Sequence, residues 1–80
     1  MMSENKKPVH KKMDIYKEKC RNKGFRKEDT RILGLLALTK DAVHAFGDSE
    51  RAFDYLINLV DKYDNSQIII DEFGTKIGLE

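Results

Sequence analysis

Histidine and cysteine residues are the first side chains to consider, because they carry much of the catalytic and metal-binding chemistry of proteins. The chain contains two histidines, His10 and His44, and one cysteine, Cys20. The histidines are far apart in the sequence, and His44 falls in an expected central helix. We therefore interpret His44 as a surface or core-edge residue rather than a general base. A single cysteine excludes an intramolecular disulfide and a thiolate metal cluster.

Carboxylates and glycines provide no metal-binding or phosphate-binding motif either. Asp61, Asp64 and Asp71 lack the alternate spacing and the internal glycine of a calcium loop. Gly74 and Gly78 are not followed by a helix N-terminus, so they do not form a phosphate-binding loop. The sequence therefore predicts no cofactor, no metal ion and no catalytic residue, and we predict that the protein is not an enzyme.

The most informative feature of the chain is the distribution of its charges. Residues 1–31 contain eleven lysines and arginines against five acidic residues, whereas residues 46–80 contain three against eight. The formal net charge of +1 therefore conceals a strongly dipolar chain. Such an asymmetry usually reports on binding partners rather than on fold. The acidic half suits a basic protein partner, and the basic half suits a nucleic acid.

The basic residues of the first helix and the turn after it are able to follow a phosphate backbone. The nucleic-acid-binding candidates are Lys12, Lys17, Lys19, Arg21, Lys23, Arg26 and Lys27. The competing interpretation is a solvated face that keeps a small protein soluble. Tyr16 and Phe25 are better used in the core, so we expect no platform for stacking bases.

Four segments must position these residues, and the first is a helix that begins at Val9. Apolar residues at steps of four and three form one stripe along it; they are Val9, Met13, Tyr16 and Cys20. Gly24 is suited to the left-handed residue just past the helix end, and Phe25 can then fold back on Cys20 in a Schellman ending. We therefore interpret Cys20 as a packing residue.

The second helix is expected from residues 28–30 to Gly47, which stops it. Its expected buried stripe is Ile32, Leu35, Leu36, Thr39, Val43 and Phe46. Leu33, Ala37 and Leu38 extend the apolar surface around the helix. A helix so apolar is central in the fold or packs on a second chain.

The third helix is expected to start at Asp48 or Ser49, which are both good N-caps. Its expected buried stripe is Ala52, Phe53, Leu56, Ile57, Val60 and Tyr63. The helix is net acidic, which is electrostatically unfavourable beside DNA phosphates. DNA reading through this helix, as in a winged helix-turn-helix, is therefore not expected.

The last segment, residues 67–79, allows two interpretations. The β-branched run from Ile68 to Ile70 favours a strand, and Gly74 suits the turn of a hairpin. The rival is a short helix from Ser66 that presents Ile69, Phe73 and Ile77 on one face. We favour the hairpin, so the predicted fold is mostly α, a three-helix domain with a C-terminal β-hairpin and a winged-helix-like outline. The fold becomes all-α if this segment is helical.

Composition predicts one domain. Residues 1–8 are polar and basic and end at Pro8, so we expect a disordered basic arm there and a single small helical domain over residues 9–80. The N-terminus lacks the apolar core of a signal peptide, and the longest apolar run is too short to span a bilayer. Together with the single cysteine, this leads us to expect a cytoplasmic protein with no membrane partner.

One stretch resembles a known family. Residues 42–56 read Ala-Val-His-Ala-Phe-Gly-Asp-Ser-Glu-Arg-Ala-Phe-Asp-Tyr-Leu. This stretch resembles the opening of the toxin-binding domain of the MbcA/ParS/Xre antitoxins, with an Ala before Phe-Gly-Asp and then Glu, Ala and an aromatic-Leu pair. The family's Asn-Thr-Pro-Asn and Leu-Gly-Gly elements are absent. The resemblance implies toxin binding in the neighbourhood of Phe46 to Leu56.

We therefore predict a small non-enzymatic regulatory protein that acts by protein–protein binding, as an antitoxin, an inhibitor or an adaptor. The residues expected to contact the partner are Phe46, Asp48, Glu50, Asp54, Leu33 and Leu38. The alternative is a nucleic-acid-binding module, a winged-helix-like transcriptional regulator that uses the basic N-terminal helix. A homodimer through the second helix is compatible with both.

Overall fold

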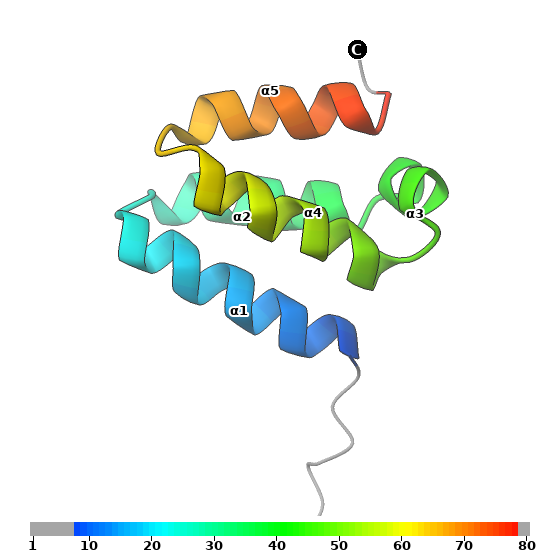
Figure 1. Cartoon of the computed structure of the whole chain (residues 1–80), viewed down its shortest axis with the longest axis horizontal. Coiled ribbons are helices and arrows are strands. Elements are labelled where there is room, and N and C mark those ends of the chain that lie inside the picture. The colour runs from blue at the N-terminus through cyan, green and yellow to red at the C-terminus, as the bar shows by residue number, and fades with distance from the viewer. Residues whose placement is uncertain (1–7, 79–80) are drawn as a thin grey trace, which may run out of the picture.

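Capping side chains and glycines divide the chain into short helices. The computed structural model describes residues 8–78, and these residues form five helices and no strand. The helices are α1 (Pro8–Lys23), α2 (Lys27–Ala37), α3 (Lys40–Phe46), α4 (Ser49–Lys62) and α5 (Ser66–Lys76) (Figure 1). Apart from Pro8, which begins α1, the predicted basic arm lies outside the described residues.

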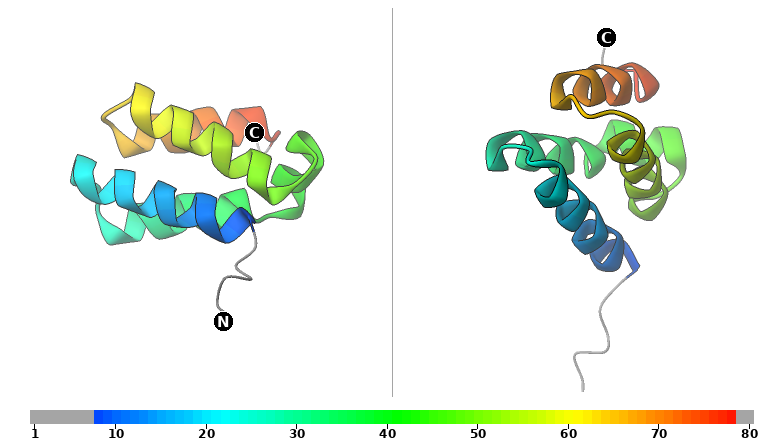
Figure 2. Two further views of the ribbon diagram at one scale, coloured as in Figure 1. Left: turned by 60° about the horizontal axis from the view of Figure 1, so that its bottom comes forward. Right: turned by 60° about the vertical axis from the view of Figure 1, so that its left-hand side comes forward.

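The end of α1 is a Schellman turn, as the sequence predicts. Gly24 has a φ of +79°, a conformation that costs a residue with a Cβ free energy. The amide of Gly24 donates to the carbonyl of Arg21, and the amide of Phe25 donates to the carbonyl of Cys20, both at 3.1 Å. The chain reverses here, so α2 returns beside α1 (Figure 2).

The predicted single helix over residues 28–46 is wrong, because the chain breaks between α2 and α3. Thr39 is extended, with φ −71° and ψ 159°. Its hydroxyl donates to the carbonyl of Leu36 at 2.8 Å and accepts from the amide of Ala42 at 3.1 Å. One side chain therefore caps the end of α2 and the start of α3. The break lets α3 turn and pack on α4.

The central element is α4, which contacts each of the other four helices (Figure 1). Its start agrees with the sequence, since the Asp48 carboxylate accepts from the amide of Arg51 at 2.8 Å. Its fully buried residues are Ala52, Phe53, Leu56 and Val60. These side chains form the middle of the hydrophobic core.

The predicted C-terminal β-hairpin is also wrong, and with it the winged-helix-like outline; the all-α alternative agrees with the structure. The Asn65 carboxamide accepts from the amides of Gln67 and Ile68, at 2.8 and 3.2 Å, and so caps α5. Ile69, Phe73 and Ile77 are buried on one helical face. This face packs against α4 and α2, which outweighs the strand preference of three consecutive isoleucines.

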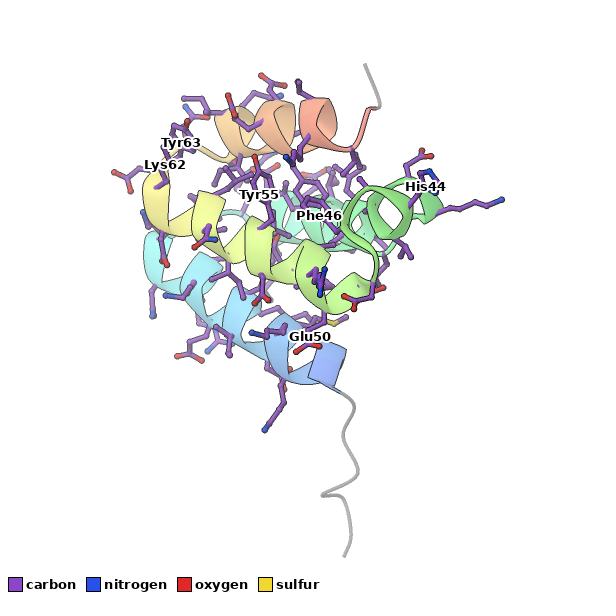
Figure 3. The ribbon with its side chains drawn as sticks, turned by 45° about the vertical axis from the view of Figure 1, so that its right-hand side comes forward. His44, Phe46, Glu50, Tyr55, Lys62 and Tyr63 are labelled. Carbon is purple, nitrogen blue, oxygen red and sulfur yellow. The ribbon has the colours of Figure 1, made fainter. Side chains whose placement is uncertain are left out.

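Aromatic rings pack on two sides of α4. On the side of α1, the rings of Tyr16 and Phe53 have centroids 5.8 Å apart. On the side of α5, Phe46 packs against Tyr55 at 5.2 Å and against Phe73 at 5.9 Å. Figure 3 shows Phe46 and Tyr55 together between α4 and α5. Tyr16, Phe53 and Phe73 are fully buried, and Phe46 and Tyr55 are partly buried against the core, so both clusters hold the helices together.

Candidate functional site

Part of the charge asymmetry of the sequence is compensated by ion pairs between the two halves of the chain. Three lysines along one face of α1 form ion pairs with carboxylates on α4 and just after it. The pairs are Lys12–Asp54 at 2.6 Å, Lys19–Asp61 at 3.0 Å and Lys23–Asp64 at 2.5 Å. The two helices run in the same direction, so the pairs follow one another along the contact. This charge ladder joins the basic and acidic halves of the chain.

Lys12 shows the electrostatic consequence. The hydrogen bond to Asp54 and the nearby charge of Glu50 raise the pKa of Lys12. Glu50 lies on the side of α4 that faces the first turns of α1 (Figure 3). Glu50 and Asp54 therefore act together on a cation of their own chain.

Arg26 and Asp29 form a second charged contact, at the start of α2. The Arg26 guanidinium donates twice to the Asp29 carboxylate, both at 3.3 Å, and also lies 3.5 Å from Glu28. Ser66 of α5 donates a further hydrogen bond to Asp29 at 3.0 Å. The hydrogen bonds from Arg26 and Ser66 lower the pKa of Asp29.

An open groove of about 440 Å³ lies between α1 and α2. Its apolar lining is provided by Met13, Tyr16, Phe25, Gly34, Leu35 and Leu38. Its basic lining, here called the groove cations, is Lys17, Arg21, Lys27 and Arg31. Among the described residues, no acidic side chain lines the groove. The groove thus combines an apolar surface with positive charge from both helices.

Two features keep the α1–α2 groove open. The Tyr16 hydroxyl donates to the carbonyl of Thr30 at 2.8 Å, which ties α1 to α2 beneath the groove. Gly34 presents no side chain to the lining, and a Cβ there would lie 3.7 Å from the Tyr16 ring. A larger side chain at position 34 would therefore extend into the groove.

The side chains of α2 that the sequence placed in the core are partly outside it. Ile32 and Leu35 are 42% and 57% exposed, and the buried face is formed by Leu33 and Ala37. The predicted stripe is wrong in this part because α2 is apolar on adjoining faces, and its packing on α4 selects one of them. Of the apolar residues outside this buried face, Leu35 and Leu38 line the groove.

The predicted partner-binding residues do not form one surface. Leu33 is fully buried, and Phe46 is packed among Tyr55 and Phe73. Asp48 caps α4, and Asp54 pairs with Lys12. Leu38, 44% exposed, is the one member of the predicted set that lines the groove.

The predicted nucleic-acid-binding residues are divided between two faces. Lys12, Lys19 and Lys23 face α4 in the charge ladder, and Arg26 pairs with Asp29. The remaining three, Lys17, Arg21 and Lys27, line the groove. Sequence reasoning did not connect them with Met13, Arg31 and Leu35. The sequence nevertheless contained a signal for this groove. Two neighbouring helices each carry a pair of cations four residues apart, and they also carry more apolar residues than the core can bury.

Cys20 and His44, the side chains considered for catalysis, lie in different parts of the fold. Cys20 is 1% exposed, and burial raises the pKa of its thiol, which agrees with the predicted packing role. His44 points away from the molecule at α3 (Figure 3). Among the residues described, no three His, Cys, Asp or Glu side chains are grouped to hold a metal ion. Within residues 8–78, no helix has the length and apolar character needed to cross a bilayer.

Comparison with protein-family models, with curated proteins and with solved structures finds no match to this chain. The resemblance of residues 42–56 to the antitoxin family therefore stays a hypothesis.

Proposed function

We propose that the protein is a small non-enzymatic regulatory protein that acts by binding another protein, and that the α1–α2 groove holds a segment of this partner. One observation carries the proposal: the groove has an apolar lining on which Leu35 and Leu38 remain exposed to solvent. Covering such a surface removes apolar area from water and is favourable. A groove between two antiparallel helices suits an amphipathic helix laid along it.

The nucleic-acid alternative has weaker support. Three of its seven candidate lysines and arginines are engaged by carboxylates of α4 and the loop after it, at 3.0 Å or less. The groove cations remain as a basic face, but they flank an apolar lining that a phosphate backbone would leave uncovered. A nucleic-acid ligand would therefore use the charge of the groove and not its apolar surface.

The antitoxin hypothesis concerns another part of the surface. The stretch that resembles the antitoxin family lies in α3 and α4, away from the residues that line the groove. The carboxylates that suggested a basic partner, such as Asp54, already pair with the chain's own lysines. We therefore propose a regulator that binds another protein. An antitoxin is one type of such a regulator and stays a hypothesis.

The test is a selection from a displayed library of random peptides of about 16 residues, a length that spans the groove as a helix. Selected peptides should bind the wild-type protein. They should bind the double variant Leu35→Gln/Leu38→Gln at least about tenfold more weakly. Both leucines are exposed, so the variant should fold normally, as circular dichroism would verify.

The matched control is Ile68→Gln, which replaces an equally exposed isoleucine on α5. Selected peptides should bind this variant as they bind the wild-type protein. If the library gives no binders, or if the binders ignore the groove leucines, the proposed function is wrong.

A further inference from the structure

The groove cations are arranged in two pairs, one on each wall. Lys17 and Arg21 are one helical turn apart on α1, and Lys27 and Arg31 have the same spacing on α2. Because α1 and α2 are joined by the reversal at Gly24, the two pairs lie on opposite sides of the groove. A helix lying between them would have positive charge along both flanks.

Three of the four groove cations lack partners, unlike the lysines of the charge ladder and Arg26. Within residues 11–78, Lys17, Lys27 and Arg31 make no ion pair or side-chain hydrogen bond. Arg21 lies 3.7 Å from Glu18, and both of these side chains are largely exposed. The chain thus compensates the cations on the α4 side of α1 and leaves those at the groove available.

Resting on the proposed function, we infer that the occupant of the groove is an acidic amphipathic helix of a partner protein. Its apolar side chains cover Leu35, Leu38 and Met13, and its carboxylates face the groove cations. From Met13 to Arg21 the wall on α1 is about 12 Å long, at 1.5 Å per residue. This length matches about two turns of a docked helix, with apolar anchors at positions i, i+3, i+4 and i+7.

The charge and the lining together select this occupant over three others. A basic helix would be repelled by four cations and would find no lining carboxylate. A nucleic acid would leave the apolar lining exposed, and Tyr16 is fully buried and offers no face for a base. The third occupant, a second copy of this chain, would have to offer an acidic helix to the groove. The acidic face of its α4 already pairs with its own α1.

The test uses three fluorescent peptides of about 16 residues, held helical by a side-chain lactam because short helices are marginal in water. The first has leucines at the anchor positions and glutamates beside them. The second has the same leucines with lysines, and the third scrambles the acidic sequence. Anisotropy titrations should show the acidic amphipathic peptide binding at least about tenfold tighter than the other two.

Variants of the full chain locate the effect. Lys17→Glu/Arg31→Glu should weaken binding of the acidic peptide at least about tenfold. Raising the salt concentration from about 50 mM to about 300 mM should weaken this binding further. The control Lys11→Glu reverses a single charge on α1 outside the groove and should have little effect. Leu35→Gln/Leu38→Gln should also weaken the acidic peptide.

Other outcomes separate this inference from the proposed function. If the lysine peptide binds as tightly as the acidic one and both depend on the groove leucines, the partner is a protein but not an acidic one. If labelled duplex DNA binds instead and depends on Lys17 and Arg31 but not on the leucines, both proposals are wrong. If no peptide binds and sedimentation shows a dimer that Leu35→Gln/Leu38→Gln dissociates, the groove belongs to a second copy and the inference is overturned.

Discussion

Asp29 shows how a single residue acquires a role that its position in the sequence only partly indicates. Its place in the first turn of α2 is typical of an acid near the positive end of a helix dipole. The structure adds hydrogen bonds from Arg26 before the helix and from Ser66 of α5. Asp29 therefore also connects the starts of two helices that are distant in the sequence.

The lowered pKa of Asp29 predicts a pH dependence of stability. Its contribution is present above the ordinary pKa of 3.8 and is lost as the pH falls through the lower folded-state pKa, because only the ionised carboxylate accepts these hydrogen bonds fully. Asp29→Asn should lower the free energy of unfolding in urea at about pH 6 and should have a smaller effect near about pH 2.5. Glu72→Gln, an exposed carboxylate on α5, is the control. An equal effect of Asp29→Asn at both pH values would contradict the assignment.

At the scale of elements, α5 is the segment whose local preference and final structure disagree. The run of three isoleucines favours a strand, but the cap at Asn65 and the buried spacing of Ile69, Phe73 and Ile77 produce a helix. Gly74 lies inside this helix, whereas a hairpin would place it in the turn. The two folds therefore make opposite demands on its backbone.

Gly74→Ala distinguishes the two structures. No atom lies within 4 Å of a Cβ at this position, so alanine should stabilise the helix by about 0.5–1 kcal/mol. Gly47→Ala is the contrasting variant, since its φ of +97° should make alanine destabilising by about 1 kcal/mol. Urea unfolding measures both changes. Destabilisation by Gly74→Ala would argue for a turn at this position.

For the whole molecule, charge organises how the two halves meet. The charge ladder between α1 and α4 neutralises part of the asymmetry that dominates the sequence. Four of the other cations of α1 and α2 line the α1–α2 groove. The molecule thus uses some cations for its own cohesion and leaves others at the groove, where we propose that a partner binds.

A double-mutant cycle at Lys19 and Asp61 tests the ladder. Lys19→Glu and Asp61→Lys should each destabilise the fold, and the double variant should recover stability because the pair is restored with its charges exchanged. The coupling should be about 0.5 kcal/mol, typical of partly exposed pairs, and should decrease with added salt. Unfolding in urea at two salt concentrations measures it. Strict additivity would show that the pair contributes nothing.

Much of the local structure is predictable from residues alone. Gly24 and Gly47 end helices because they readily adopt a positive φ. Asp48 begins a helix because its carboxylate accepts a hydrogen bond from a backbone amide of the first turn, which has no partner within the helix. The buried face of α4 follows from the spacing of Phe53, Leu56 and Val60. These features depend on neighbours within a few positions, so the sequence determined them by itself.

The tertiary structure decided what depends on residues far apart in the chain. It broke the apolar segment at Thr39, made a helix of α5, and chose Leu33 and Ala37 as the buried face of α2. It also separated the cations paired with α4 from those at the groove. Packing and ion pairing depend on which helices become neighbours, and periodicity within one helix contains no information about that choice. The sequence determined how many charged and apolar side chains the protein has, and the fold decided which of them remain exposed and unpaired.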